Sequence, residues 1–98
     1  MIKHSVVFKL KYPQGSKEEA AFFVAAKQLA AIPAVENFEC LKQVSKKNGY
    51  SFGLSMQFAN QQVYDAYSNH PAHLAFIQQH WLPCVTDFME IDYEPLVD

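Results

Sequence analysis

The residues best suited to chemistry lie in one stretch, residues 67–76, which reads YSNHPAHLAF and holds two of the four histidines. A neutral imidazole can accept a proton from an acidic C–H or a phenolic O–H at neutral pH. A tyrosine hydroxyl can stabilise the oxyanion that forms. We therefore predict that His73 is a general base and Tyr67 an oxyanion donor. That pair suits aldol-type cyclisation, decarboxylation or isomerisation of a small ketone or phenol.

Pro71 divides this stretch into two helices. Proline lacks a backbone N–H and disfavours helical geometry at the preceding residue, so a helix through Tyr67 is expected to end near Asn69 or His70. The same proline suits the first turn of a second helix, and side chains from both helices can converge at the junction. His70 has two interpretations here. It is either part of a binding site or a cap for the backbone groups that the break leaves free.

A third histidine lies in the first predicted strand. Residues 2–12 alternate, and one face carries Ile2, His4, Val6, Phe8, Leu10 and Tyr12. His4 is the polar exception on this face, so we predict that it approaches residues 67–76 across an apolar pocket. The predicted ligand-binding residues are His4, His70, Phe8, Phe76, Ile77 and Trp81. The alternative is that His4, Tyr67 and His73 only satisfy one another, or backbone groups, within the core.

The remaining predicted elements form the framework that supports residues 67–76. Ser16 and Glu19 fit a capping box that starts a helix, and Pro33 ends it. Residues 35–45 and 51–58 read as a hairpin joined by a turn at Lys46–Gly49, where Asn-Gly favours positive φ. In residues 51–58 one face is apolar, and the other carries the small or polar residues Ser51, Gly53, Ser55 and Gln57.

The second half of the chain continues with helices and a strand. Asn60 is a plausible N-cap for the helix that carries Tyr67. After Pro71 an apolar stripe is formed by Leu74, Ile77, Trp81 and Val85, with an end near Pro83. The last strand, residues 88–94, places Met89, Ile91 and Tyr93 on one face and Glu90, Asp92 and Glu94 on the other. This order predicts one ferredoxin-like α+β domain over residues 1–98, βαββαβ with a split second helix.

Composition excludes several classes of function. The net charge is −2 and the pI about 6.0, and all eight basic residues are lysines, which disfavours nucleic-acid binding. No apolar run is long enough for a membrane span, and the first residues lack the pattern of a signal peptide. The two cysteines, Cys40 and Cys84, lie far apart without a CxxC motif, which favours reduced thiols in a cytoplasmic protein.

A metal site is a further interpretation of the histidines. His4, His70 and His73, with or without His80, are potential ligands for Zn, Cu or Ni. However, a His-x-x-His spacing interrupted by proline is not a recognised ligand pattern, and residues 67–76 contain no acidic residue. We therefore predict neither a metal nor another cofactor.

Three stretches resemble the stress-responsive dimeric α/β-barrel (Dabb) family. They are residues 2–11 (IKHSVVFKLK), residues 67–76 and residues 87–93 (DFMEIDY). The resemblance implies a dimeric α/β barrel, a homodimer in which two sheets pack face to face. The family includes cofactor-free cyclases of the olivetolic acid cyclase type. Their catalytic histidine and tyrosine match His73 and Tyr67, and a histidine matching His4 lines their pocket. Other family members are known as stress-associated proteins, so a non-catalytic structural or binding protein is the alternative.

Overall fold

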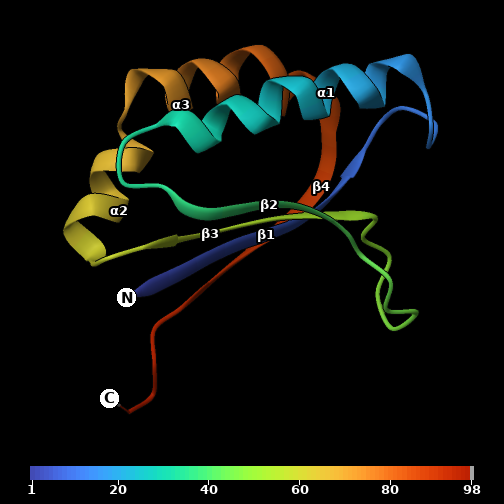
Figure 1. The fold of residues 1–98 in the computed structure, drawn as a ribbon. Coiled ribbons are helices and arrows are strands. Elements are labelled where there is room, and N and C mark those ends of the chain that lie inside the picture. The colour runs from blue at the N-terminus through green and yellow to red at the C-terminus, as the bar shows by residue number, and fades with distance from the viewer. Residues whose placement is uncertain (98) are drawn as a thin grey trace.

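The computed structural model describes residues 1–97, which form a four-stranded antiparallel sheet with strand order β2-β3-β1-β4. The strands are β1 (Ile2–Leu10), β2 (Glu36–Lys42), β3 (Phe52–Phe58) and β4 (Val85–Tyr93). All helices lie on one face of the sheet, and the opposite face is left open (Figure 1). The predicted ferredoxin-like α+β fold is thus confirmed.

The first helix is α1 (Lys17–Lys27), which continues into the 3-10 helix η1 (Gln28–Ala31). The Ser16 hydroxyl accepts a hydrogen bond from the Glu19 N–H at 3.2 Å, as the capping box requires. In a capping box the Glu19 carboxylate would accept from the Ser16 N–H, but here it has a different donor. It accepts from the Gly15 N–H at 2.6 Å, because the Ser16 N–H already donates to the Pro13 carbonyl.

The predicted split of the second helix is confirmed. The first piece is α2 (Gln61–Ser68), capped by the Asn60 side chain, which accepts from the Val63 N–H at 3.0 Å. The second piece is α3 (Pro71–Phe76), in which proline occupies the first helical turn.

A π-helical turn that the sequence did not predict follows α3. It is η2 (Ile77–Trp81), and α4 (Leu82–Cys84) ends the helix one residue after Pro83, close to the expected end. The Leu82 N–H donates to the Ile77 carbonyl, five residues back, which shifts the helical phase. The expected apolar stripe is therefore wrong in part: Trp81 is buried as expected, but Leu74 is 50% exposed and Val85 belongs to β4 and not to the helix.

The pairing of β1 with β4 decides which face of the last strand meets the helices. His4 lies opposite Asp92, and Val6 lies opposite Glu90. Neighbouring residues in an antiparallel register share a face, so the acidic face of β4 is directed toward the helices. The apolar face of β4, with Met89 and Tyr93, belongs to the open side of the sheet. The strand also begins at Val85 rather than at Phe88.

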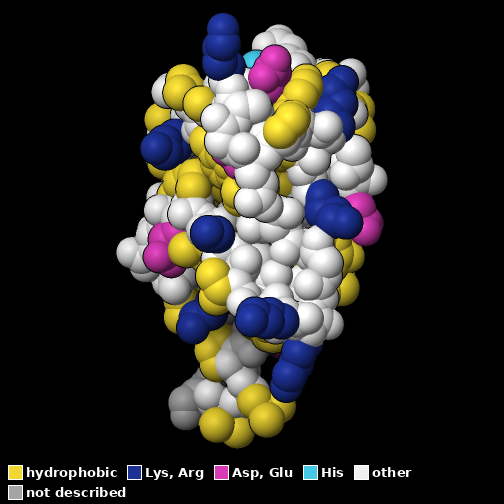
Figure 2. Space-filling view, turned by 90° about the vertical axis from the view of Figure 1, so that its right-hand side faces the viewer, with side chains coloured by type: hydrophobic (Ala, Val, Ile, Leu, Met, Phe, Trp, Pro, Cys, Tyr) yellow, Lys and Arg dark blue, Asp and Glu magenta, His cyan; other side chains and the backbone are white. Residues whose placement is uncertain are grey.

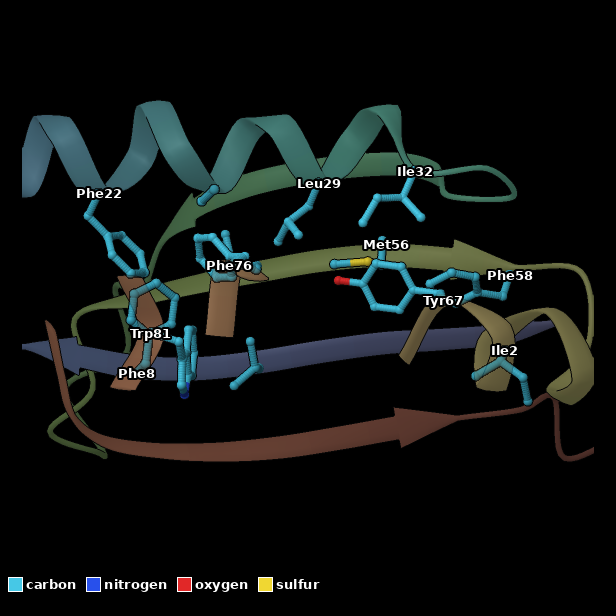
Figure 3. Packing of buried hydrophobic residues seen from close by; sticks show 13 residues of the cluster. Ile2, Phe8, Phe22, Leu29, Ile32, Met56, Phe58, Tyr67, Phe76 and Trp81 are labelled. Carbon is cyan, nitrogen blue, oxygen red and sulfur yellow. The ribbon is translucent and has the colours of Figure 1, made fainter. Parts of the chain in front are cut away.

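The apolar core fills the layer between helices and sheet. Figure 3 shows Phe22, Leu29 and Ile32 pointing from the first helical segment toward the strands. Phe8 has no exposed surface, and its ring centroid lies 5.0 Å from that of Trp81 and 5.6 Å from that of Phe22. This packing holds α1 and the η2 turn in fixed positions over β1.

The surface carries no large patch of one charge on the side drawn in Figure 2, where lysine side chains are spread along the molecule. Within residues 1–97, none of the helices has the length and apolar character needed to cross a bilayer.

Candidate active site

A small cleft opens between β1, β4 and the helices α2, α3 and η2. Four polar side chains line it: His4, Tyr67, His73 and Glu90. The rest of its wall is apolar and includes Val6, Leu29, Leu54 and Met56. The cavity volume available to the centre of a water molecule is about 30 Å³. A single ordered water needs roughly 10–15 Å³ on this scale, so the enclosed part of the cleft has room for about two waters. The empty space of the whole cleft, including its open mouth, is about 330 Å³.

His73 is held by a hydrogen bond within the helix junction. Its Nδ1 lies 3.0 Å from the carbonyl oxygen of Ser68. A carbonyl only accepts, so Nδ1 carries the proton and donates, and Nε2 of the neutral imidazole keeps its lone pair. Burial lowers the pKa of His73, opposed by the Ser68 hydrogen bond. His73 is therefore a neutral imidazole at neutral pH, the form that a general base needs.

Tyr67 lies beside His73, with ring centroids 4.6 Å apart. Its ring packs against Phe58, and Figure 3 shows its hydroxyl directed away from Phe58 along the layer. Burial, and then the charge of Glu90, raise the pKa of Tyr67 well above its ordinary value. The phenol thus keeps its proton and can donate it in a hydrogen bond.

His4 is fixed by two residues outside the predicted site. Its Nδ1 lies 2.6 Å from Asp92 Oδ1 and 2.9 Å from the Tyr64 hydroxyl. The Tyr64 O–H donates to Asp92 Oδ2 at 2.8 Å. An ionised carboxylate only accepts, so Nδ1 donates to Asp92, and Nε2 is the unprotonated nitrogen in the neutral ring. Asp92 and Tyr64 therefore hold His4 in one tautomer and one orientation.

Six of the eight predicted site residues come together in the cleft: His4, Tyr67, His73, Phe76, Ile77 and Trp81. His70 and Phe8 do not line it. The His70 Nδ1 accepts from the Ala72 N–H at 3.1 Å and so caps α3. Phe8 lies wholly within the core. Of the two interpretations of His70, the geometry corresponds to the capping one.

Sequence reasoning missed Glu90, Asp92 and Tyr64. The register between β1 and β4 would have placed the two acidic residues beside His4 and Val6. An antiparallel β1–β4 pair brings residues near the end of one strand beside those near the start of the other. Tyr64 lies one helical turn before Tyr67, so the same face of α2 presents both rings to the sheet.

The described residues, 1–97, contain no group of three or more His, Cys, Asp or Glu side chains placed to hold a metal ion. The His70 Nδ1 accepts from the Ala72 N–H, and His70 does not line the cleft that His4 and His73 line.

The fold and the cleft place this chain among small α+β proteins that have a ferredoxin-like sheet and a split second helix. Within that class, the chain belongs to the stress responsive A/B barrel domain (Dabb) family, whose sequence model matches residues 2–95. No curated protein matches the sequence.

Solved structures agree with this assignment. A Dabb family protein with a ferredoxin-like fold from Mesorhizobium loti is 50% identical, covers 98% of this chain and 97% of its own, and has a TM-score of 0.96. Hydroxynitrile lyase from Passiflora edulis is 14% identical, covers 94% of this chain and 90% of its own, and has a TM-score of 0.82. A dimeric ferredoxin-like protein from Thermobifida fusca is 21% identical, covers 94% and 88%, and has a TM-score of 0.77. At these identities the last two show a shared fold alone.

Proposed function

We propose that this protein is a cofactor-independent acid–base enzyme that acts on a small, largely apolar ketone or phenol bound in the cleft. One observation carries the proposal. Within a single apolar cleft, His73 keeps a lone pair on Nε2 while the neighbouring Tyr67 hydroxyl remains protonated. A base and a hydrogen-bond donor side by side are the two groups that proton transfer next to a carbonyl requires.

The proposed first step moves one proton. His73 Nε2 removes a proton from the carbon next to the carbonyl group, and the C–H electron pair forms the C=C bond of an enolate. The carbonyl π electrons move to oxygen, where the Tyr67 O–H stabilises the negative charge by a hydrogen bond. The imidazolium then returns its proton to the product, so the enzyme is regenerated. Cyclisation and isomerisation both begin with this step.

His4 acts as a positioning group in this proposal. Its orientation is fixed by Asp92 and Tyr64, so it offers the ligand a polar atom of defined geometry. The Passiflora protein is a hydroxynitrile lyase, so a fold of this shape supports catalysis in at least one protein.

We further propose that the protein is a cytoplasmic homodimer that pairs through the open face of its sheet. Met89 and Tyr93 on that face are about half exposed, and the Thermobifida protein of the same fold is dimeric. Both cysteines are unpaired, which fits a reducing compartment.

The test is exchange of carbon-bound hydrogen for deuterium in small aryl-substituted ketones such as phenylacetone, followed by NMR in D2O. We expect wild-type protein to accelerate exchange at the α-carbon. His73→Gln should lower the rate by about 10²–10⁴-fold, the usual contribution of a general base. Tyr67→Phe should lower the rate while the protein stays folded.

His70→Gln is the matched control, because it changes a histidine of the same segment that caps α3 outside the cleft. It should retain exchange activity. If wild-type protein accelerates no exchange, or if His73→Gln is as active as wild type, the enzyme proposal is wrong. A non-catalytic binding protein is then the better account.

A further inference from the structure

Glu90 is an unusual residue in the cleft wall. Of the described residues that line the cleft, it is the only one with a carboxylate, and none is lysine. It lies on β4 opposite Val6, on the strand face directed toward the helices. The side chain is exposed and β4 is an edge strand of the sheet, so the carboxylate lies at the solvent-accessible side of the cleft.

Structural roles do not account for this carboxylate. Among residues 1–97 the one contact of a histidine, lysine or N-terminal nitrogen with a carboxylate within 4 Å is that of His4 with Asp92, so no cation is placed to neutralise Glu90. No hydrogen bond within the same part of the chain involves the Glu90 side chain, whereas Asp92, two residues later, holds both His4 and Tyr64. Glu90 therefore contributes a negative charge to the cleft without stabilising a neighbouring element.

The charge of Glu90 also acts on both reactive groups. After burial, it is the next cause that raises the pKa of Tyr67. It also favours the protonated form of His73, against the larger effect of burial. An imidazolium formed by proton abstraction would thus be stabilised by Glu90. The enolate and the imidazolium form together and add no net charge, whereas a ligand that enters as an anion adds a negative charge and would be repelled.

We propose that Glu90 makes this cleft selective for uncharged ligands, so that carboxylates and phosphates bind more weakly than neutral molecules of the same shape. The inference rests on the proposed function and narrows it. A β-keto acid carries the carboxylate that decarboxylation would remove, so it is a poor ligand here. Of the three reactions considered for this site, cyclisation and isomerisation of a neutral ketone or phenol are the two that this selectivity favours.

The expected size of the effect follows from Coulomb's law. Two like charges about 6 Å apart, in a partly solvated site of effective dielectric constant about 40, repel enough to weaken binding about tenfold. Glu90 is an exposed residue, so a much larger effect is not expected.

The experiment compares matched neutral and anionic probes of nearly the same shape. Benzamide and benzoate, and 4-hydroxybenzamide and 4-hydroxybenzoate, are titrated at neutral pH. Dissociation constants are read from NMR shifts of Tyr67 and His73, which locate binding in the cleft. Wild-type protein should bind each amide at least about tenfold more tightly than its carboxylate. Glu90→Gln should reduce that ratio to about two or less by improving carboxylate binding.

Glu18→Gln is the control, since it removes one exposed acidic charge from the first turn of α1, at a residue that does not line the cleft. It should leave the ratio unchanged. Equal binding of amide and carboxylate by wild type, or an unchanged ratio in Glu90→Gln, overturns the inference while the ligand-binding proposal stands. Failure of all four probes to perturb Tyr67 and His73 overturns both.

Discussion

The Nδ1 atom of His4 and the Oδ1 atom of Asp92 lie 2.6 Å apart across the neighbouring strands β1 and β4. The two residues are separated by most of the chain, and only the antiparallel register brings them together. The bond gives a strand histidine a defined tautomer at the edge of an apolar cleft. The same carboxylate holds Tyr64 at 2.8 Å, so one acidic side chain orients groups from the sheet and from α2.

Replacing Asp92 should change the tautomer of His4. In Asp92→Asn the amide N–H or the Tyr64 O–H can donate to Nδ1, so the imidazole proton is expected on Nε2 in part of the molecules. The ¹⁵N chemical shifts of the His4 ring measure this directly. Because the Asp92 side chain is 40% exposed, we expect the free energy of unfolding to fall by only about 1 kcal/mol. Tyr64→Phe is the control that keeps the carboxylate, and the proton should stay on Nδ1. An unaltered tautomer in Asp92→Asn would contradict this account.

His73 should make stability depend on pH. Its pKa in the folded protein is lowered from the ordinary 6.5 by burial. Below pH 6.5 the unfolded chain therefore binds more protons at this position than the folded one. The contribution of neutral His73 is present above that pH and is lost as the pH falls through the folded pKa. Denaturant unfolding of wild type and His73→Gln at a series of pH values isolates this contribution. A difference between them that stays constant from neutral pH downward would show that His73 titrates normally.

Phe8 should be a core residue and not a ligand contact. Phe8→Ala is expected to lower the free energy of unfolding by about 3–5 kcal/mol, because the ring is wholly buried among aromatic neighbours. Val24→Ala, at a side chain that is 65% exposed on α1, should change it by about 0.5 kcal/mol or less. Denaturant titration compares the two. A stable Phe8→Ala protein with impaired probe binding would place Phe8 in the site after all.

The open face of the sheet should govern assembly. The double variant Met89→Lys and Tyr93→Lys places two like charges on each copy where we propose that two sheets pack. We expect a monomer, measured by analytical ultracentrifugation over a range of protein concentrations. Val24→Lys, on the helix side, should assemble as wild type does. A wild-type monomer, or an intact dimer in the double variant, would reject this interface.

Local patterns in the sequence predicted most of the scaffold. The alternation in β1, the Ser16 and Asn60 caps and the break at Pro71 each depend on residues close together in the chain. Because each pattern acts locally, the strand, the two caps and the helix break are found where the sequence predicts them. Residues 67–76 likewise supplied Tyr67, His73 and Phe76, because one helix junction positions all three.

What the sequence did not predict depended on pairing between distant segments. The alternation in β4 defines two faces but not which one meets the helices, so the positions of Glu90 and Asp92 required the β1–β4 register. The π-helical turn was missed because its residues have ordinary helix-forming patterns. Leu74 was assigned to the buried stripe on the assumption of an unbroken 3.6-residue period.

The π-helical turn makes the length of the segment Ile77–Trp81, and not only its composition, a determinant of the cleft. A chain with one residue deleted there would recover regular α-helical bonding. Everything beyond the deletion would then rotate by about 100° relative to α3. Trp81 would leave its place against Phe8, and one wall of the cleft would be rebuilt from different side chains. Single-residue insertions and deletions in this turn are therefore a route by which relatives of this fold can acquire differently shaped sites over an unchanged sheet.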